Sequence, residues 1–248
     1  MKDTLPKLIN IGKIVKNEEK QYDPGLYLIP TPIGNLEDMT IRALRLLSVA
    51  EIIACEDTRV TGQLLKQYSI TPQKLYSCRE HNEKSVSEYL CTEVLSGKRV
   101  CYVSDAGTPG ISDPGMILIQ TAINLNIPYH VLPGATAIIP ALIQSGFAND
   151  DWCFMGFPPH KKGRESFIQS VSQRHTVIVL YESPYRIMDL LEAFQQNDFL
   201  KKRRLYVVRE ITKKFEQSFR GTPQEILQNM SDHQTKGEFV LVIDKENE

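Results

Sequence analysis

Short apolar runs that alternate with helical segments constrain the fold of this chain more than any other feature of its sequence. The runs of strand length are 26–29, 52–55, 100–104 and 129–132, and the helical segments between them are 41–47, 60–68, 82–95, 115–124 and 135–145. Strands separated by helices in this way build a mostly parallel sheet with helices on its faces. We therefore predict a doubly wound α/β domain in the first part of the chain.

The rhythm changes after a polar break at 146–151. The strands predicted beyond it are 152–155, 176–181, 205–208, 217–220 and 238–243, and the helices are 165–172, 185–195 and 223–229. Because several later strands follow one another closely, we expect a mixed second sheet with antiparallel pairs. The sequence thus predicts an N-terminal α/β domain over 25–148 and a C-terminal α/β domain over 149–248. Residues 1–24 form an N-terminal extension to which we assign no role.

Composition narrows the class of protein. The chain carries a formal net charge of −1, and it has no apolar run near the ~18 residues that cross a bilayer. Residues 1–20 lack the apolar stretch of a signal peptide, so we expect a cytoplasmic protein. The five cysteines form no C-x-x-C pair, which favours buried free thiols over a zinc site. We expect no bound metal.

Three loops directly follow predicted strands, at 30–36, 104–115 and 133–137. In open α/β sheets, ligands bind outside the carboxyl ends of the strands. The loop 104–115, which we call the glycine-rich loop, has three internal or terminal glycines and two Ser-Asp pairs but no lysine or arginine. It matches neither the P-loop motif G-x-x-x-x-G-K-S/T nor the dinucleotide-binding motif G-x-G-x-x-G, and it suits a ligand with hydroxyls, amines or positive charge. A rigid connector at 30–36 and a plain helix start at 133–137 are the alternative interpretations.

A polar cluster follows the strand 52–55. It contains Glu56, Asp57 and Arg59, and a second polar run at 79–83 contains His81. Carboxylates, a histidine and an arginine at strand ends can bind a substrate or move a proton. Asp57 and His81 are the candidate bases, with Glu56 in reserve and Arg59 as a positioning group. Exposed surface charge and a structural histidine are the alternatives.

Basic residues gather in three short clusters, at 161–164, 201–204 and 213–214. Such clusters can follow the phosphates of a nucleic acid. Solvated helix ends explain them equally well.

Several motifs, taken together, resemble a known family. They are Leu-Tyr-Leu-Ile-Pro-Thr-Pro-Ile-Gly-Asn-Leu at 26–36, Glu-Asp-Thr-Arg at 56–59, the glycine-rich loop, Tyr-Glu-Ser-Pro at 181–184, Arg-Glu-Ile-Thr-Lys at 209–213 and Gly-Glu-Phe-Val-Leu at 237–241. Their order and spacing, over about residues 25–243, are similar to those of the bacterial ribosomal RNA small subunit methyltransferase I family. That family is a branch of the tetrapyrrole-methylase superfamily. The combination is specific, although each motif alone is not.

The resemblance implies an activity, a cofactor and an assembly. Members methylate the ribose 2′-hydroxyl of a cytidine in 16S rRNA, near the decoding centre of the small ribosomal subunit. They use S-adenosylmethionine, release S-adenosylhomocysteine, fold as two α/β domains with the cofactor in the cleft between them, and form homodimers. The cofactor contacts implied by the motifs are Pro32, Asp105, Gly107, Thr136 and Ala137 from the first domain, and Leu180, Tyr181, Glu238 and Phe239 from the second. The implied RNA contacts are Arg59, Lys161, Lys162, Arg164, Arg209 and Lys213.

Two departures from the family pattern lie on the RNA side. Tyr185 stands where the family usually has histidine, and the sequence Pro-Pro-His at 158–160 replaces a more usual Leu-Pro-Arg. Two rival functions stay open at this point. One is a methyltransferase of the same superfamily that acts on a small tetrapyrrole, and the other is a catalytically silent RNA-binding relative. The motifs at 56–59 and 209–213 favour the RNA methyltransferase over the first rival, and the cofactor loops favour it over the second.

Overall fold

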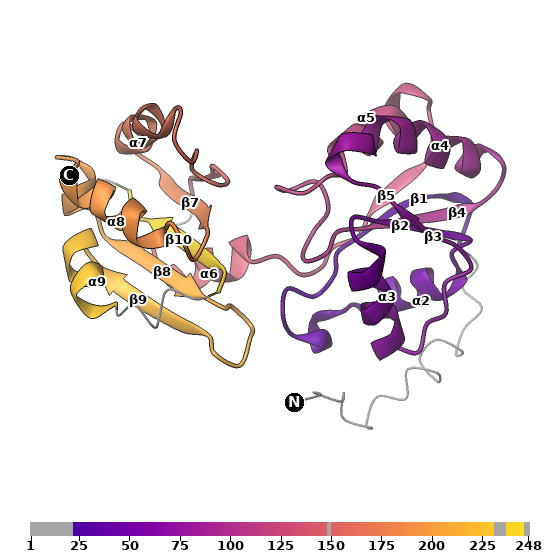
Figure 1. Ribbon diagram of the computed structural model, residues 1–248, viewed down its shortest axis with the longest axis horizontal. Helices are drawn as coiled ribbons and strands as arrows, with labels where there is room; N and C mark the ends of the chain where they lie inside the picture. Colours follow the sequence, from indigo (N-terminus) through magenta and orange to yellow (C-terminus); the bar gives the residue numbers. More distant parts are fainter. Residues whose placement is uncertain (1–21, 148–149, 231–236, 246–248) are drawn as a thin grey trace. The chain divides into compact units, whose positions relative to one another are not determined.

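The computed structural model describes residues 22–147, 150–230 and 237–245 (Figure 1). The chain divides into two compact units, with the division between Thr136 and Ala137. We call them unit one and unit two. Almost all of the predicted extension 1–24 lies outside the described residues. No helix within those residues is long and apolar enough to cross a membrane.

Unit one contains a five-stranded sheet with the strand order β3-β2-β4-β1-β5. Its strands are β1 (Gly25–Ile29), β2 (Ile52–Cys55), β3 (Leu75–Ser77), β4 (Arg99–Val103) and β5 (Tyr129–Val131). Its helices are the short 3-10 turns η1 (Leu36–Asp38) and η2 (Glu80–Asn82), and α2 (Ile41–Val49), α3 (Thr58–Gln67), α4 (Glu83–Leu95) and α5 (Met116–Asn124). Every neighbouring pair of strands in this sheet is parallel, which confirms the predicted α/β architecture.

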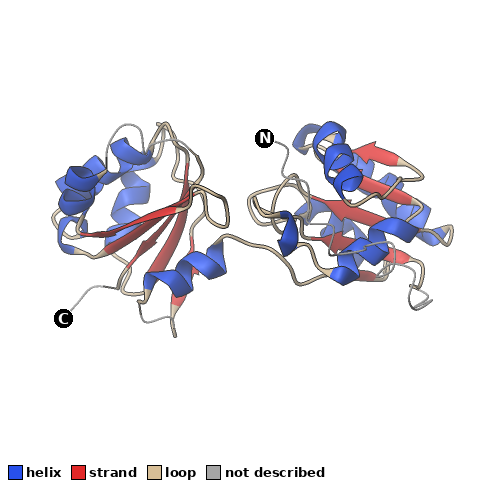
Figure 2. Ribbon diagram, turned by 90° about the horizontal axis from the view of Figure 1, so that it is seen from below, coloured by secondary structure: helices blue, strands red, loops and turns tan. Residues whose placement is uncertain are grey.

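Helices cover both faces of this sheet (Figure 2), because successive side chains along its strands are apolar and point to opposite faces. Leu26 and Leu28 of β1 pack in one core with α4 and α5, whereas Tyr27 and Ile29 pack in another core with α2 and α3. The hydroxyl of Thr40 accepts the backbone N–H of Ala43 at 3.1 Å and so caps α2. Such a cap stabilises a helix by about 1 kcal/mol.

Unit two contains a mixed sheet with the strand order β6-β7-β10-β8-β9. Its strands are β6 (Trp152–Phe154), β7 (Val177–Glu182), β8 (Leu205–Arg209), β9 (Gln217–Gly221) and β10 (Phe239–Ile243). Its helices are α6 (Ile138–Ser145), α7 (Arg164–Ser172), α8 (Ile187–Gln196), the 3-10 turn η3 (Leu200–Lys202) and α9 (Pro223–Asn229). Strands β6 and β7 are parallel and the other pairs are antiparallel, which confirms the expected mixed sheet.

Helix α6 packs with unit two, which moves the boundary between the units away from its predicted position. Its buried residues, among them Ile138, Ala141 and Leu142, pack toward β10 and β8 of unit two. The helix therefore belongs to unit two, and the division falls at Thr136 and Ala137 rather than at the expected 148–149. The predicted polar break at 146–151 follows the end of α6, and its residues 148–149 lie outside the described residues.

The cysteines lie where their sequence context predicted. Cys55, Cys78, Cys91 and Cys101 are buried free thiols, and Cys153 is half-buried. Burial raises the pKa of Cys55 to about 11, which keeps its thiol protonated and unreactive.

Candidate functional site

The parallel strands of unit one end at a common level. Ile29 of β1 pairs with Val103 of β4, and Cys55 of β2 pairs with both Val103 and Ser77 of β3. The loops that follow these strands therefore leave from one edge of the sheet, where α/β proteins bind ligands. We call this side of unit one the loop edge, and its loops are 30–36, 56–59, 104–115 and 132–136.

Backbone hydrogen bonds fasten these loops to one another. The N–H of Thr31 donates to the carbonyl of Gly107 at 2.9 Å, and the N–H of Gly107 donates to the carbonyl of Thr31 at 3.0 Å. The Thr31 hydroxyl is buried and donates to the carbonyl of Ser104 at 3.1 Å. The hydroxyl of Thr108 donates to the carbonyl of Ala135 at 3.0 Å. The first, second and third predicted ligand loops thus form one connected surface.

The glycine-rich loop has a backbone that few residues adopt. Gly107 has φ +77, and Ser112 has φ +93 although it is not a glycine. A Cβ at position 107 would lie 3.4 Å from Cγ2 of Ile33. Non-glycine residues in such conformations cost free energy and cluster at binding and catalytic sites. The strained backbone of this loop agrees with its prediction as a ligand-binding loop.

Glu56, the first residue after β2, sits beside two other carboxylates. Burial, and after it the charges of Asp113 and Asp105, raise the pKa of Glu56 to about 7, although a hydrogen bond from the Asp105 backbone opposes them. Its Oε1 is buried and has no hydrogen-bond partner among the described residues. A carboxyl group with a pKa near neutrality can take up or release a proton at physiological pH.

Asp57 is engaged differently. Its Oδ1 accepts the backbone N–H of Arg59 at 2.8 Å, which caps α3, and its Oδ2 pairs with the Arg59 guanidinium at 2.5 Å. These hydrogen bonds hold the pKa of Asp57 well below its usual range. Asp57 is therefore ionised and a weak base. The pair also restrains Arg59, whose side chain is 82% exposed.

The segment after β3 brings two further side chains to the loop edge. Nε of Arg79 donates to the carbonyl of Glu56 at 3.3 Å. Glu83 is 5% exposed, and its Oε1 accepts the backbone N–H of Gly115 at 2.7 Å, at the end of the glycine-rich loop. His81, the candidate in this segment, is exposed in η2. Sequence reasoning chose His81 for its chemistry, but the structure gives the defined contacts to its neighbours Arg79 and Glu83.

One end of the sheet in unit two carries several of the predicted residues. Phe239 pairs with Glu182 of β7 and with Arg209 of β8, and Arg209 pairs with Gln217 of β9. The residues 210–216 connect β8 to β9 at this end, so we call them the hairpin. Nε of Arg209 donates to Oε1 of Gln217 at 3.2 Å.

Lys213 joins the hairpin to the start of β10. Its Nζ donates to Oε1 of Glu210 at 3.0 Å and to Oε2 of Glu238 at 2.8 Å. Although burial favours the neutral amine, these hydrogen bonds hold the pKa of Lys213 above its usual value. Lys213 is charged and positions other groups, and it cannot readily serve as a base.

The basic side chains of the predicted clusters differ in their exposure to solvent. Lys161 and Lys162 are exposed in the turn before α7, and Arg164 begins that helix with a buried Nη2 that has no hydrogen-bond partner among the described residues. Arg203 of the cluster 201–204 is only 4% exposed. Its guanidinium donates to the carbonyls of Val171, Arg174, Thr176 and Asp244. Arg203 is therefore structural, and interpreting the whole cluster as a phosphate-binding surface was wrong for this residue.

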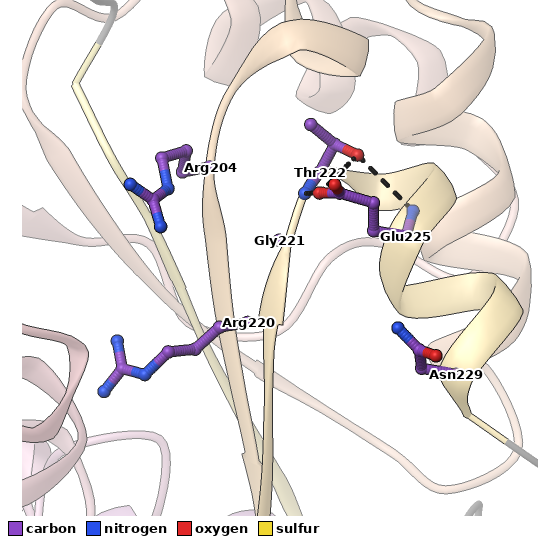
Figure 3. Close-up of a pocket in the computed structure, with 6 residues that line it drawn as sticks. All are labelled: Arg204, Arg220, Gly221, Thr222, Glu225 and Asn229. Atoms are coloured by element: carbon purple, nitrogen blue, oxygen red, sulfur yellow. Dashed lines mark hydrogen bonds between the residues drawn. The ribbon is translucent and has the colours of Figure 1, made fainter.

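Arg204 belongs to a pocket beside β9 (Figure 3). The pocket is lined by Arg204, Arg220, Gly221, Thr222, Glu225 and Asn229. Arg220 is held by the carbonyls of Gln144 and Ser145, and its guanidinium lies 4.3 Å from the ring centroid of Tyr206. The pocket thus places one structurally committed arginine and a carboxylate beside Arg204, and we assign it no role.

Comparison with known proteins identifies the family. The sequence profile of the family described as Tetrapyrrole (Corrin/Porphyrin) Methylases matches residues 25–227. A protein of Synechocystis sp. named ribosomal RNA small subunit methyltransferase I is 45% identical over 88% of this chain and 78% of its own length. Proteins of the same name are 42% identical in Hydrogenobaculum sp., over 90% and 96%, and 41% identical in Bacillus subtilis, over 90% and 75%. The chain belongs to the ribosomal RNA small subunit methyltransferase I branch of the tetrapyrrole methylases.

Solved tetrapyrrole methylases share the fold of this chain. The crystal structure of uroporphyrin-III-C-methyltransferase from Thermus thermophilus superposes with a TM-score of 0.63 and 17% identity. The match covers 90% of this chain and 94% of that one. This likeness shows the architecture of both units, and at such identity it shows nothing of the substrate.

The residues of unit one that were predicted to contact the cofactor lie on the loops described above. Pro32 and Gly107 are buried, and Asp105, Thr136 and Ala137 are half-buried. The first three belong to the connected loops 30–36 and 104–115, and the last two stand where the third loop leads into α6.

The residues of unit two that were predicted to contact the cofactor differ in how far their side chains are exposed. Leu180 and Phe239 are 0% and 1% exposed and belong to the core, so only their main chains can reach a ligand. Tyr181 is half-buried, and its ring packs 4.9 Å from that of Phe154. The side chain of Glu238 is 77% exposed and pairs with Lys213.

Proposed function

We propose that this methylase transfers a methyl group from S-adenosylmethionine to the 2′-hydroxyl of a cytidine in 16S rRNA of the small ribosomal subunit. The names of relatives at 45% and 41% identity carry the ribosomal substrate. The connected loop edge supports the donor site. The resemblance adds a cytoplasmic location and a homodimer, and light scattering at micromolar protein tests the dimer.

The chemistry of the loop edge fits S-adenosylmethionine. The glycine-rich loop contains two carboxylates and no lysine or arginine, so it suits a positively charged group rather than a phosphate. Its strained backbone and the small side chains at 134–137 leave room for a close approach. Pro32, Asp105, Gly107, Thr136 and Ala137 would hold the cofactor, which supplies an electrophilic methyl group when bound.

The residues proposed from unit two would complete this site. Tyr181 and Glu238 offer side chains, whereas Leu180 and Phe239 offer only backbone N–H and C=O groups because their side chains fill the core. Neither main-chain contact would be sensitive to an apolar substitution that preserves the packing.

The chain must also align the acceptor hydroxyl. A ribose hydroxyl is a poor nucleophile, and holding it in line with the methyl group can lower the barrier by ~7–11 kcal/mol. The Asp57–Arg59 pair suits this task because Asp57 restrains an exposed guanidinium, which can bind an RNA phosphate. Arg209, Lys213, Lys161, Lys162 and Arg164 of unit two are the further proposed RNA contacts.

Three groups can take the proton of the hydroxyl, namely Glu56, Asp57 and His81. Asp57 is a weak base, because its hydrogen bonds with Arg59 stabilise its ionised form. Glu56 has a pKa of about 7 and a buried oxygen without a partner among the described residues. We therefore place proton acceptance on Glu56, with His81 as the alternative. A positioned base typically contributes ~10²–10⁴-fold to the rate.

No observation favours the rival substrates. The likeness to uroporphyrin-III-C-methyltransferase rests on 17% identity and concerns the fold alone. A silent RNA-binding relative would have no need for a strained glycine-rich loop beside a carboxyl group of near-neutral pKa.

Ribose methylation in cells tests the proposal. Ribosomal RNA from the source organism and from a strain lacking this gene is digested, and 2′-O-methylated nucleotides are mapped by mass spectrometry. We expect one methylated cytidine of 16S rRNA to disappear in the deletion strain and to return with the wild-type gene. An unchanged pattern would contradict the proposal.

A further inference from the structure

The hairpin 210–216 carries an exposed aromatic ring that the predicted RNA contacts do not include. Phe215 is 68% exposed, and Nζ of Lys214 lies 5.7 Å from the centroid of its ring. Lys214 and Glu216 on either side are exposed as well. An isolated exposed apolar residue is common on protein surfaces, so the exposure of this ring does not by itself indicate a binding site.

The backbone of the hairpin that carries this ring has an unusual conformation. Glu210 and Thr212 have φ +53 and φ +66, in the left-handed region that non-glycine residues avoid. The N–H of Thr212 donates to Oε2 of Glu216 at 2.6 Å, and the N–H of Glu216 donates to the carbonyl of Lys213 at 3.0 Å. The strained turn is thus fixed by its own hydrogen bonds. Backbone strain of this kind is concentrated at binding and catalytic sites of proteins.

The start of β10 anchors the same hairpin from the side. A Cβ at Gly237, which has φ +100, would lie 2.5 Å from the Glu210 side chain, so only glycine permits this approach. The N–H of Glu238 donates to Oε1 of Glu210 at 3.1 Å, and Lys213 bridges both carboxylates. The tip therefore projects from a rigid base.

The hairpin stands at the end of the sheet where the proposed substrate and cofactor residues of unit two lie. It connects β8 to β9 (Figure 1), and Arg209, Phe239 and Glu182 lie side by side across the neighbouring strands. Tyr181 is the next residue of β7. A nucleotide held at the tip would be part of the RNA segment that these residues are proposed to bind.

We propose that Phe215, together with Lys214, forms a stacking platform for an unpaired base of the RNA substrate. The inference rests on the proposed rRNA substrate and deepens it. Aromatic rings stack on the face of any base, and an adjacent cation adds attraction to the backbone phosphate. A preformed hairpin presents the ring with little ordering cost. A protein partner would require a wider apolar core, whereas this ring stands between two charged side chains.

The test compares three variants of the full-length protein. Phe215→Ala removes the ring, Phe215→Trp keeps a stacking surface, and Phe199→Ala removes a 57% exposed phenylalanine elsewhere in unit two. The probes are unmodified small ribosomal subunits and a single-stranded RNA that contains 2-aminopurine, whose fluorescence is quenched by stacking. Calorimetry with S-adenosylmethionine and light scattering check the cofactor site and the assembly.

We expect Phe215→Ala to weaken RNA binding roughly 5- to 150-fold and to lose the quenching, as removal of one stacked base does. Phe215→Trp should stay close to wild type, and Phe199→Ala should be unchanged. Equal RNA binding by Phe215→Ala and Phe199→Ala would overturn the inference. So would a loss of cofactor affinity or a change of mass in Phe215→Ala, since the ring would then belong to the cofactor site or to a subunit interface.

The outcomes separate this inference from the proposed function. If the wild type binds RNA in a manner that depends on Phe215 but methylates no ribosomal RNA, the proposed function fails and the platform stands. If the wild type methylates ribosomal RNA and Phe215→Ala does so with the same KM, the platform fails and the function stands. If the wild type binds neither probe, both fail.

Discussion

The backbone N–H of Asp57 donates a hydrogen bond to Oδ1 of Asp105 over 3.2 Å. The backbone N–H of Asp105 in turn hydrogen-bonds the carboxylate of Glu56. This reciprocal contact joins the loop after β2 to the loop after β4. The proposed acceptor side and the proposed donor side of unit one are therefore held in one arrangement, as a methyl transfer that depends on alignment requires.

Gly107→Leu should abolish binding of S-adenosylmethionine. The new side chain would start 3.4 Å from Ile33 and fill the loop edge. Gly97→Leu is the matched control, because Gly97 also has a positive φ but a Cβ added there would meet no other side chain or loop within 4 Å. Both variants should lose about 1–2 kcal/mol of stability from backbone strain. Calorimetry that finds equal cofactor affinity in the two would place the cofactor elsewhere.

Glu56→Gln should change how stability depends on pH. The pKa of Glu56 is about 7 in the folded protein, above its ordinary value of 4.5, so the native state binds this proton more tightly than the unfolded chain. The free energy of unfolding should therefore fall as pH rises from about 4.5 to 7, by roughly 1–2 kcal/mol after solvent screening. Urea unfolding at pH 5 and pH 8 measures this fall.

In Glu56→Gln that part of the pH dependence should be absent. The control is Glu192→Gln, which removes an exposed carboxylate from α8 of unit two. If Glu56→Gln and Glu192→Gln show the same pH dependence as the wild type, Glu56 does not carry the raised pKa.

The three proton-acceptor candidates should separate in single-turnover methyl transfer. With Glu56 as acceptor, the wild-type rate rises with pH and levels off above about 7, and Glu56→Gln is at least ~10²-fold slower at unchanged cofactor affinity. Asp57→Asn keeps a residue that caps α3 well, so it removes the charge without removing the cap. It should lose less than Glu56→Gln, and His81→Ala should stay near wild type. A ~10²-fold loss in either of these instead would assign the proton to that residue.

Binding of small ribosomal subunits should depend on salt through the lysines before α7. Each phosphate that the protein neutralises contributes about 0.7–0.9 to the slope of log affinity against log salt. The double substitution Lys161→Ala and Lys162→Ala should lower that slope by about 1–2. Lys98→Ala is the control, because Lys98 pairs with Glu93 and precedes β4, at the sheet edge opposite the loop edge. Equal slopes in both variants would remove the two lysines from the RNA contacts.

Most strands and helices could be predicted because each carries its own pattern. The runs 26–29, 52–55 and 100–103 within β1, β2 and β4 are apolar and buried throughout, and the capped helices α2 and α9 begin at the predicted residues. Strand β3 was missed because Leu75–Ser77 is short and half-buried throughout, so it shows neither an apolar run nor an alternation. The division at Thr136 was missed because a helix does not record in its sequence which of two sheets it packs on.

Part of the candidate site could likewise be predicted from the sequence and part of it could not. The glycine-rich loop was predictable from its position after a strand and from its composition. The raised pKa of Glu56 was not, because it depends first on burial and then on the charges of Asp113 and Asp105, which only the fold brings beside it. Arg203 looked like its exposed neighbours, yet four backbone carbonyls hold it inside unit two. Sequence shows which chemical groups are present, and tertiary packing decides their pKa values and their exposure.

Transfer of a labelled methyl group in a purified system tests the central proposal most directly. The protein is incubated with methyl-labelled S-adenosylmethionine and small ribosomal subunits from cells that lack this gene, and Gly107→Leu serves as the inactive control. We predict label on a single cytidine ribose of 16S rRNA with the wild type, none with Gly107→Leu, and none on uroporphyrinogen III with either. Label on the tetrapyrrole, or cofactor binding without any label on the rRNA, would contradict the account.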